Sequence, residues 1–474
     1  MAAPPPSHVV VFPYMAQGHT IPLLDIAKAF ANHGLKITLI TTPSNAPFVF
    51  SKTSNHPNIS LSIIPFPRVQ ELPQGCENTA DLPSMALLAP FIEATKKMKQ
   101  PFEGVLRDMI DDGCRPICVI SDFFLGWTLD SCRSFGIPRI VCHGMGVLPM
   151  AICKSIRLHV PTIKASSDLD PIEFPHLKTP FTLLKADLPE GLVDADPDDA
   201  FMRLSLEAAE ADVNSWGVVV NSFGAIEGDH AGVLESFYAN QAKAYCVGPF
   251  LLYDRLGKEV GAEEESYSYI KWLDEQAGSG GVIYVSFGTQ SHLSEHQMDE
   301  IAFGLEMASH PFIWIVRSTT WVSPDGWNER VGRRGLVVQD WVDQRSILAH
   351  PATGGFLSHC GWNSVLESLS MGVPLLTWPM LSFSDQPLNA KFIAVGCGAG
   401  LMIPQREVGG EKIVTVGRDV ICDGVKELMG GEKGREARER AQALGRLARH
   451  AVETGGSSVT KLDELIEQLR RKNM

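Results

Sequence analysis

Residue types that could bind a charged, hydroxylated ligand are concentrated between residues 341 and 386. In this segment GGFLSH predicts a strand, CGWNS a tight turn, and SVLESLSMG a short helix that ends in glycine. The turn would present the backbone N–H groups of Asn363 and Ser364 at the helix N-terminus, shortly after His359. Because the N-terminus of a helix attracts anions, this pattern predicts a site for a pyrophosphate.

Two further side chains in the segment suit the nucleoside part of such a ligand. Glu367, about one helical turn after Ser364, could accept hydrogen bonds from a ribose diol, and Trp341 could stack on a base. Taken singly, Trp341 could instead be a core aromatic, His359 a buried imidazole and Glu367 an exposed helix residue. Their coincidence on one strand–turn–helix unit favours the binding site.

His19 and Asp122 form a second candidate site, because each follows a predicted buried strand (HVVVFP and ICVIS). Ligands of open α/β sheets gather at the carboxyl ends of the strands. We expect His19 to lie in the loop before the first helix, whose N-terminus disfavours imidazolium, and to accept a proton. Asp122 could hydrogen-bond the other ring nitrogen. The residues alone leave two alternatives open, a loop histidine and a helix N-cap.

The elements that would position both groups follow an α/β pattern. HVVVFP (8–13) predicts a strand, IPLLDIAKAFANHG (21–34) a helix and LKITLITT (35–42) a second strand, so the chain opens as a βαβ unit of a parallel sheet. The pattern restarts at GVIYVSFGT (281–289), after a polar stretch typical of an interdomain linker. We therefore expect two parallel-sheet domains facing across a cleft. The expected division is a first domain at residues 1–252, a linker at 253–270 and a second domain from residue 271.

Composition fits a compact globular protein and narrows its function. Of 474 residues, 45% are hydrophobic and 20% charged. The 41 Lys and Arg against 55 Asp and Glu give a formal charge of −14, which disfavours nucleic acid as a partner. There is no basic, apolar leader and no apolar run long enough to span a membrane, so we expect a cytoplasmic protein. Ten sparse cysteines, several in apolar runs, predict reduced thiols and no zinc site.

Two other nucleotide-binding classes lack their motifs. A dinucleotide-binding domain needs G-x-G-x-x-G between a strand and a helix, whereas the first loop holds only Gly18. A P-loop needs G-x-x-x-x-G-K-[ST], and GGEKGREARER lacks the closing Lys-Ser/Thr. The sequence therefore argues against a nicotinamide or flavin oxidoreductase and against a P-loop nucleotidase.

The segment at residues 341–386 resembles the signature of plant family-1 UDP-glycosyltransferases. The matching pieces are WVDQ (341–344), GGFLSHCGWNS (354–364), Glu367, GVP (372–374), WP (378–379) and DQ (385–386). The resemblance extends over nearly the whole chain, including the first-loop GH, VGP (247–249) and SFGT (286–289). It implies the GT-B fold, α/β with two Rossmann-like domains. The N-terminal domain would bind a lipophilic acceptor, the C-terminal domain (271–457) would bind the UDP-sugar, and a final helix (458–474) would pack back on the first domain.

The resemblance also implies residue roles in donor binding. UDP-glucose would be the donor co-substrate, with no permanently bound cofactor. The implied contacts are Trp341 and Val342 with uracil; Gln344 and Glu367 with ribose; Thr289, His359, Asn363 and Ser364 with the phosphates; and Trp362, Asp385 and Gln386 with the sugar, while Gly18 and Gly361 complete the donor site.

By the same resemblance His19 and Asp122 are the catalytic pair of an inverting hexosyltransferase. The helix N-terminus would stabilise the departing diphosphate, which makes a metal unnecessary. D-x-D patterns at 168–170 and 194–198 lie in a polar, Pro-rich stretch and are interpreted as solvated loop, so we expect no metal site. The alternative is a catalytically silent protein of this fold that binds a UDP-sugar or a hydrophobic metabolite.

The acceptor is the least specified part of this hypothesis. A flavonoid or other phenolic is a family-level expectation, and the enzyme is expected to act as a monomer. Aromatic and apolar residues at the presumed sheet edge could line the acceptor pocket, although each could equally be core: Tyr14, Phe123, Phe124, Trp127 and Met145.

Two departures from the family pattern concern the donor site. Asp343 stands where the family has proline, and we expect it to loosen the loop. The segment from Trp378 to Gln386 is two residues longer than in the family, with the insertion at 381–384, which could displace Asp385 and Gln386 from the sugar.

Overall fold

The structure is a computed structural model that describes residues 7–193, 196, 198–253, 268–276, 280–291, 293–318, 320–380, 384–404 and 415–472. The chain divides into two compact units. Unit 1 comprises residues 1–154, 195–256 and 451–474, and unit 2 comprises residues 155–194 and 257–450. Most of the expected linker, residues 254–267, lies outside the described residues, as do residues 194, 195 and 197 of the second D-x-D stretch.

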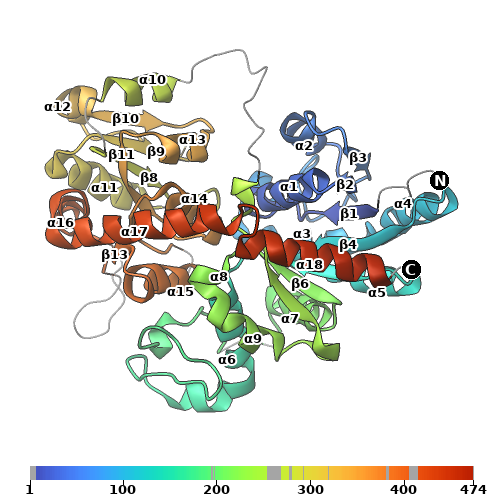
Figure 1. Ribbon diagram of the computed structural model, residues 1–474. Coiled ribbons are helices and arrows are strands. Elements are labelled where there is room, and N and C mark those ends of the chain that lie inside the picture. The colour runs from blue at the N-terminus through green and yellow to red at the C-terminus, as the bar shows by residue number, and fades with distance from the viewer. Residues whose placement is uncertain are drawn as a thin grey trace. The chain divides into compact units, whose positions relative to one another are not determined.

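Unit 1 is built on a seven-stranded parallel sheet in the order β3-β2-β1-β4-β5-β6-β7 (Figure 1). Its central strands are continuous apolar runs, as expected where helices cover both faces of a sheet. The strands are β1 (His8–Phe12), β2 (Lys36–Thr41), β3 (Ile59–Ile63), β4 (Pro116–Asp122), β5 (Arg139–Cys142), β6 (Gly217–Val220) and β7 (Lys243–Cys246). The helices are α1 (Gln17–Asn32), α2 (Ala46–Thr53), α3 (Leu88–Lys96), α4 (Lys99–Asp111), η3 (Phe123–Leu125), α5 (Thr128–Ser134), α6 (Val147–Ala165, which continues into unit 2), α7 (Ala200–Val213), α8 (Gly224–Glu227), α9 (Ala231–Glu235) and α18 (Ser457–Lys472).

Unit 2 repeats the architecture with a six-stranded parallel sheet in the order β10-β9-β8-β11-β12-β13 (Figure 1). The strands are β8 (Val282–Ser286), β9 (Phe312–Ile315), β10 (Gly335–Val338), β11 (Thr353–Ser358), β12 (Leu375–Thr377) and β13 (Gly400–Met402). The helices are α10 (Ser268–Glu275), α11 (Glu295–Ala308), α12 (Trp327–Val331), α13 (Gln344–Ala349), α14 (Trp362–Met371), α15 (Gln386–Lys391), α16 (Arg418–Gly430) and α17 (Glu432–Ala451). The predicted α/β class with two Rossmann-like parallel-sheet domains is confirmed.

The last helix of the chain, α18, packs in unit 1 against β4 and β7. Its apolar face is buried in the same core as the first strand, β1. At its start Ser458 Oγ donates to the carbonyl of Gly248 (2.5 Å), and further along the helix Gln468 accepts from the Tyr245 hydroxyl (2.6 Å). Unit 1 therefore combines the two ends of the chain in one core.

The first helix begins earlier than the sequence predicts. The expected start at residue 21, with Pro22 in the first helical position, is wrong because α1 begins at Gln17. The backbone N–H groups of His19 and Thr20 both donate to the carbonyl of Ala16 (3.0 and 2.8 Å). Pro22 removes a single backbone donor one turn later, which the helix tolerates. His19 therefore lies in the first turn of α1 and not in the preceding loop.

Among the helices in the described ranges, none combines the length and the apolar character that crossing a membrane requires.

Candidate active site

His19 and Asp122 meet at the carboxyl edge of the unit 1 sheet. β1 pairs with β4 in a register that places Phe12 opposite Ser121, so the residues that follow β1 lie beside the end of β4. His19 Nδ1 lies 2.7 Å from Asp122 Oδ2. The His19 side chain is 24% exposed and the Asp122 side chain 1% exposed, so a ligand could reach the imidazole while the carboxylate stays inside the protein.

Asp122 is both a helix cap and the partner of His19. Its Oδ1 accepts a hydrogen bond from the backbone N–H of Phe124 (2.9 Å) and so caps η3. Its Oδ2 is the atom that faces His19. Because an ionised carboxylate only accepts hydrogen bonds, this contact favours, for the neutral ring, the tautomer with the proton on Nδ1 and the lone pair on Nε2. The pair thus has the tautomer that a general base needs.

Aromatic side chains surround His19. The rings of Tyr14 and Phe124 lie 5.5 and 5.6 Å from the imidazole, centroid to centroid. Burial, with the nearby Asp122 charge adding to it, raises the pKa of Tyr14 well above its usual value, so the phenol stays protonated. Its buried hydroxyl has no hydrogen-bond partner within the described part of the chain.

The other predicted acceptor residues divide into two groups. Phe123 and Met145 pack on a neighbouring cluster that includes Val141 and Val218. Trp127 packs edge-on against Phe12 and Phe102, and its Nε1–H donates to Thr95 Oγ1 (3.2 Å). The structure therefore places Tyr14 and Phe124 next to His19, whereas Trp127 packs against core aromatic residues.

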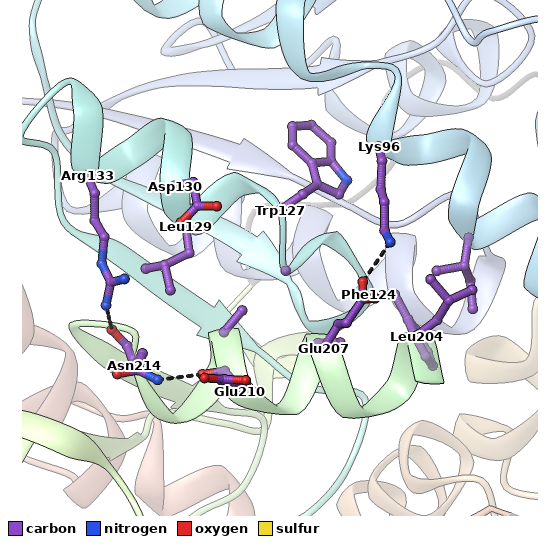
Figure 2. Close-up of a pocket in the computed structure, with 14 residues that line it drawn as sticks. Lys96, Phe124, Trp127, Leu129, Asp130, Arg133, Leu204, Glu207, Glu210 and Asn214 are labelled. Atoms are coloured by element: carbon purple, nitrogen blue, oxygen red, sulfur yellow. Dashed lines mark hydrogen bonds and ion pairs between the residues drawn. The ribbon is translucent and has the colours of Figure 1, made fainter. Parts of the chain in front are cut away.

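Trp127 and Phe124 also line a pocket of about 420 Å³ in unit 1, between α3, α5 and α7 (Figure 2). An ion pair between Lys96 and Glu207 (2.6 Å) and a hydrogen bond from Arg133 to the carbonyl of Asn214 (3.3 Å) lie at its wall. The pocket lining therefore mixes apolar and charged side chains.

Two aromatic residues near His19 escaped the sequence analysis. Phe91 of α3 packs edge-on against Tyr14 (5.8 Å), and Phe201 of α7 lies 6.4 Å from Phe124. Both come from helices far from residues 14–19 in the sequence, and no motif marks them. Only the packing of α3 and α7 against η3 identifies them.

The predicted anion site in unit 2 is a strand–turn–helix unit, as expected. β11 ends at Ser358, Gly361 is the N-cap of α14, and His359 lies between them. A Cβ on Gly288 or on Gly361 would lie 2.7 Å from His359 Nε2, so both positions leave room only for glycine beside the imidazole. Burial lowers the pKa of His359 to about 4, which keeps the ring neutral near pH 7.

Three residues expected at a ribose or phosphate form one hydrogen-bonded group. Gln344 Nε2 donates to Glu367 Oε2 (2.7 Å) and to Ser364 Oγ (3.0 Å). Arg345 Nε donates to Glu367 Oε1 (2.8 Å), a contact that the sequence analysis did not foresee. Two side chains of α13 therefore hold the carboxylate of Glu367, which belongs to α14, in one orientation.

Asp343 stabilises the donor-site loop, so the expectation that it loosens the loop is wrong. Its Oδ1 accepts from the backbone N–H groups of Arg345 (3.1 Å) and Ser346 (3.4 Å), and its Oδ2 accepts from Ser346 Oγ (2.7 Å). Its own backbone N–H, which proline would lack, donates to the hydroxyl of Tyr269 (3.0 Å). An N-cap aspartate thus organises α13 where the family pattern has proline.

Trp341 is not a core aromatic, because 49% of its surface is exposed. The guanidinium carbon of Arg317 lies 5.2 Å from its ring centroid, and the adjacent Val342 is buried. Thr289 is exposed in the loop after β8, within unit 2. Gly18 is exposed in the first turn of α1 and belongs to unit 1.

Of the residues expected at the sugar, Asp385 and Gln386 lie at the start of α15 and Trp362 lies at the start of α14. Trp362 is buried at the first position of α14, and Gln386 Oε1 accepts from the backbone N–H of Met380 (2.9 Å). Asn389 Nδ2 donates both to Asp385 Oδ2 (2.8 Å) and to the carbonyl of Cys360 (3.0 Å). Residues 381–383 of the predicted insertion lie outside the described residues. Through these two hydrogen bonds, Asn389 connects the start of α15 to the turn before α14.

Comparison with known proteins gives consistent matches. Residues 256–429 match the family model described as UDP-glucoronosyl and UDP-glucosyl transferase. UDP-glycosyltransferase 90A1 of Arabidopsis thaliana is 37% identical, over 98% of this chain and 96% of that protein. UDP-glucose flavonoid 3-O-glucosyltransferase 7 of Fragaria ananassa is 35% identical over the same shares. The structure of Phytolacca americana UGT2 with UDP-2-fluoro-glucose and pterostilbene superposes with a TM-score of 0.80 at 28% identity, covering 98% of this chain and all of the other.

Proposed function

The chain belongs to the plant UDP-glycosyltransferase family, and from this premise we propose that it transfers glucose from UDP-glucose to a hydroxyl group of a small lipophilic acceptor. A flavonoid or a related phenolic is the favoured acceptor, in keeping with the strawberry relative named for that activity. The observation that carries the proposal is the 2.7 Å contact between the accessible His19 imidazole and the buried Asp122 carboxylate.

In the proposed reaction His19 acts as the general base. Its Nε2 takes the proton of the acceptor hydroxyl while the oxygen attacks the anomeric carbon of the sugar. The bond between that carbon and the diphosphate oxygen breaks, its electron pair leaves with UDP, and the configuration at the anomeric carbon inverts. Asp122 fixes the ring tautomer and stabilises the imidazolium that forms.

We assign binding of the UDP-sugar donor to residues of unit 2. The half-exposed face of Trp341 suits stacking on uracil, and the oriented carboxylate of Glu367 suits the ribose hydroxyls. The N-terminus of α14 and the neutral His359 would stabilise the charge that develops on the diphosphate. Protein groups would thereby supply the stabilisation that metal-dependent transferases obtain from a cation.

The acceptor is assigned to the aromatic surroundings of His19. The partly exposed ring of Phe124 provides an apolar surface beside His19 on which a flat phenolic could stack, and the buried Tyr14 ring packs against both.

The test is a matrix of UDP-glucose, UDP-galactose, UDP-rhamnose and UDP-glucuronate against flavonoid, other phenolic, terpenoid and hormone acceptors, with products identified by mass. We expect a glucosylated phenolic, formed equally well with a chelator present. His19→Ala should lower kcat by about 10²-fold or more, the usual range for loss of a general base.

His33→Ala is the matched control, because His33 also lies at an end of α1 within 3.6 Å of an aspartate, Asp463. It should retain wild-type turnover. Wild-type activity in the His19→Ala variant would contradict the assigned base. Tight UDP binding without product from any pair would favour the silent binding protein instead.

A further inference from the structure

Arg139, the first residue of β5, carries a guanidinium buried directly behind Asp122. The residue is 1% exposed. Its Nε donates to Ser121 Oγ (2.8 Å) and Thr128 Oγ1 (2.9 Å), and its Nη1 donates to Ser215 Oγ (2.7 Å). One side chain thus links the end of β4, the start of α5 and the turn before β6.

Besides a hydrogen bond from its Nη1 to the Ala211 carbonyl (3.5 Å), Arg139 makes a contact that reaches the proposed dyad itself. Its Nη2 donates to the main-chain carbonyl of Asp122 (3.1 Å). All three oxygens of Asp122 are then engaged: Oδ2 by His19, Oδ1 by the N–H of Phe124, and the carbonyl by Arg139. The hydrogen bond from Arg139 therefore restrains the Asp122–Phe123 peptide, next to the Cα atom that carries the Asp122 side chain.

The hydrogen bonds of Arg139 do not by themselves account for a buried positive charge. Within the described residues no carboxylate lies in ion-pair contact with it, and burying an unpaired cation costs several kcal/mol. Two buried carboxylates are near enough to favour its charge, Asp212 and Asp122. Asp212 already contacts Lys154, and His143 Nε2 lies 3.2 Å from it. Asp212 and Asp122 are therefore the two buried anions near the Arg139 guanidinium, and Asp122 is the one whose main-chain carbonyl also accepts a hydrogen bond from it.

We propose that Arg139 is a positioning residue of the His19–Asp122 dyad, which holds the Asp122 carboxylate against the imidazole through the Asp122–Phe123 peptide. This inference rests on the proposed function, because the dyad is assigned there. Arg139 would touch neither substrate, so its loss should change turnover and leave donor binding almost unchanged.

A double-mutant cycle tests the proposal. Arg139→Lys keeps the charge but cannot span the hydroxyl groups and the carbonyl together, and we expect kcat to fall about 10-fold or more while the KM for UDP-glucose changes less than about 2-fold. In an Asp122→Asn background the same substitution should lower kcat less than about 2-fold further, because its target is already lost. If the fold-changes in kcat of the two single variants multiplied in the double variant, the two residues would act independently, and the proposal would be overturned.

Arg115→Lys is the matched control. Arg115 precedes the opposite end of β4 and likewise donates to main-chain carbonyls, those of Phe135 (2.5 Å) and Gly136 (3.3 Å). It should leave kcat and KM at wild-type values. A loss of turnover equal to that of Arg139→Lys would mean that any disturbance of the strand suffices, which would also overturn the proposal.

A spectroscopic measurement separates this inference from the proposed function. The proton of His19 Nδ1 should give a low-field NMR signal that disappears in His19→Ala. In Arg139→Lys the signal should move upfield or broaden, whereas Arg115→Lys should keep it in place. An unchanged signal in Arg139→Lys would contradict the positioning role. This readout needs no turnover, so an inactive wild-type protein would count against the proposed function alone.

If Arg139→Lys does not fold, Ser215→Ala replaces it. This variant keeps the guanidinium and removes the hydroxyl that anchors its Nη1. We expect the same upfield movement or broadening of the His19 signal, and a smaller fall in kcat. A folded Ser215→Ala variant with a wild-type signal and wild-type kcat would count against the proposal.

Discussion

His19 and His359 show how burial and partners give one residue type two different properties. His19 is accessible and faces a buried carboxylate, which suits a group that must gain a proton during the reaction. Burial, opposed by a backbone contact at Ser286, instead lowers the pKa of His359 to about 4. A neutral ring beside a helix N-terminus adds no charge of its own to the site proposed for the diphosphate.

The depressed pKa of His359 predicts a specific loss of stability in acid. As the pH falls below 6.5, the unfolded chain takes up a proton at this position, whereas the folded protein does not until about pH 4. Within that window the free energy of unfolding should fall with decreasing pH, by at most about 1.4 kcal/mol per unit from this group. In His359→Gln the difference between urea unfolding curves at pH 7.5 and pH 5 should therefore be smaller than in wild type.

His350→Gln is the control for this experiment. His350 lies in the same unit, but its Nε2 is 3.1 Å from the Asp274 carboxylate. This variant should not reduce the loss of stability between pH 7.5 and pH 5, because a protonated His350 would be favoured by that carboxylate. A His359→Gln variant with the wild-type dependence would show that His359 does not resist protonation in the folded protein.

At the level of elements, the candidate site depends on the turns that connect strands to helices. The strand–turn–helix at residues 353–371 could be predicted because its glycines, polar turn and apolar runs are contiguous in sequence. The start of α1 could not, because Pro22 suggested a first helical position and the competing hydrogen bonds to the Ala16 carbonyl leave no signature in residue types. Asp343 was misjudged because its capping role depends on the conformation of the loop, which a comparison with proline does not reveal.

Two glycines that flank β8 offer a matched test of how closely the loop after β8 surrounds the His359 ring. Gly280 and Gly288 both have a positive φ, 75° and 78°, so alanine costs each of them about 1 kcal/mol through the backbone. At Gly280 the nearest atom to an added Cβ lies 3.8 Å away, whereas at Gly288 it is His359 Nε2 at 2.7 Å.

We therefore expect Gly288→Ala to be less stable than Gly280→Ala by about 1–3 kcal/mol, because the imidazole must move. Only Gly288→Ala should also weaken UDP binding, measured by titration calorimetry. Equal stability and equal UDP affinity of the two variants would mean that His359 is not confined by this loop.

At the scale of the whole molecule, contacts between distant segments set the limit of what sequence reasoning can reach. The two-domain α/β architecture follows from local patterns of strands and helices, and it is confirmed. Arg139, Phe91 and Arg317 contact site residues only because the sheets and helices assemble around them. Each is an ordinary residue within an ordinary element, so its type and spacing carry no signal of a role.

The clearest such contact joins the two ends of the chain. Val9 and Val11 of β1 share a core with Leu465 and Leu469 of α18. Leu465 is 0% exposed, so Leu465→Ala should lower the free energy of unfolding by about 2–5 kcal/mol, as removal of a buried leucine side chain does. Thr460→Ala, on the exposed face of the same helix, should change it by less than about 0.5 kcal/mol.

Chemical denaturation of the full-length protein measures both variants, with unfolding of unit 1 followed by hydrogen exchange of the β1 and β4 amides. We expect the lost stability of Leu465→Ala to appear as faster exchange in β1, whose side chains share the core with α18. Since β4 ends at Asp122, the same loosening should lower the temperature at which turnover is lost, without changing kcat below it. Slower exchange, or no change in β1, would mean that α18 is held by its polar contacts at Gly248 and Tyr245, and that the core of unit 1 forms without the end of the chain.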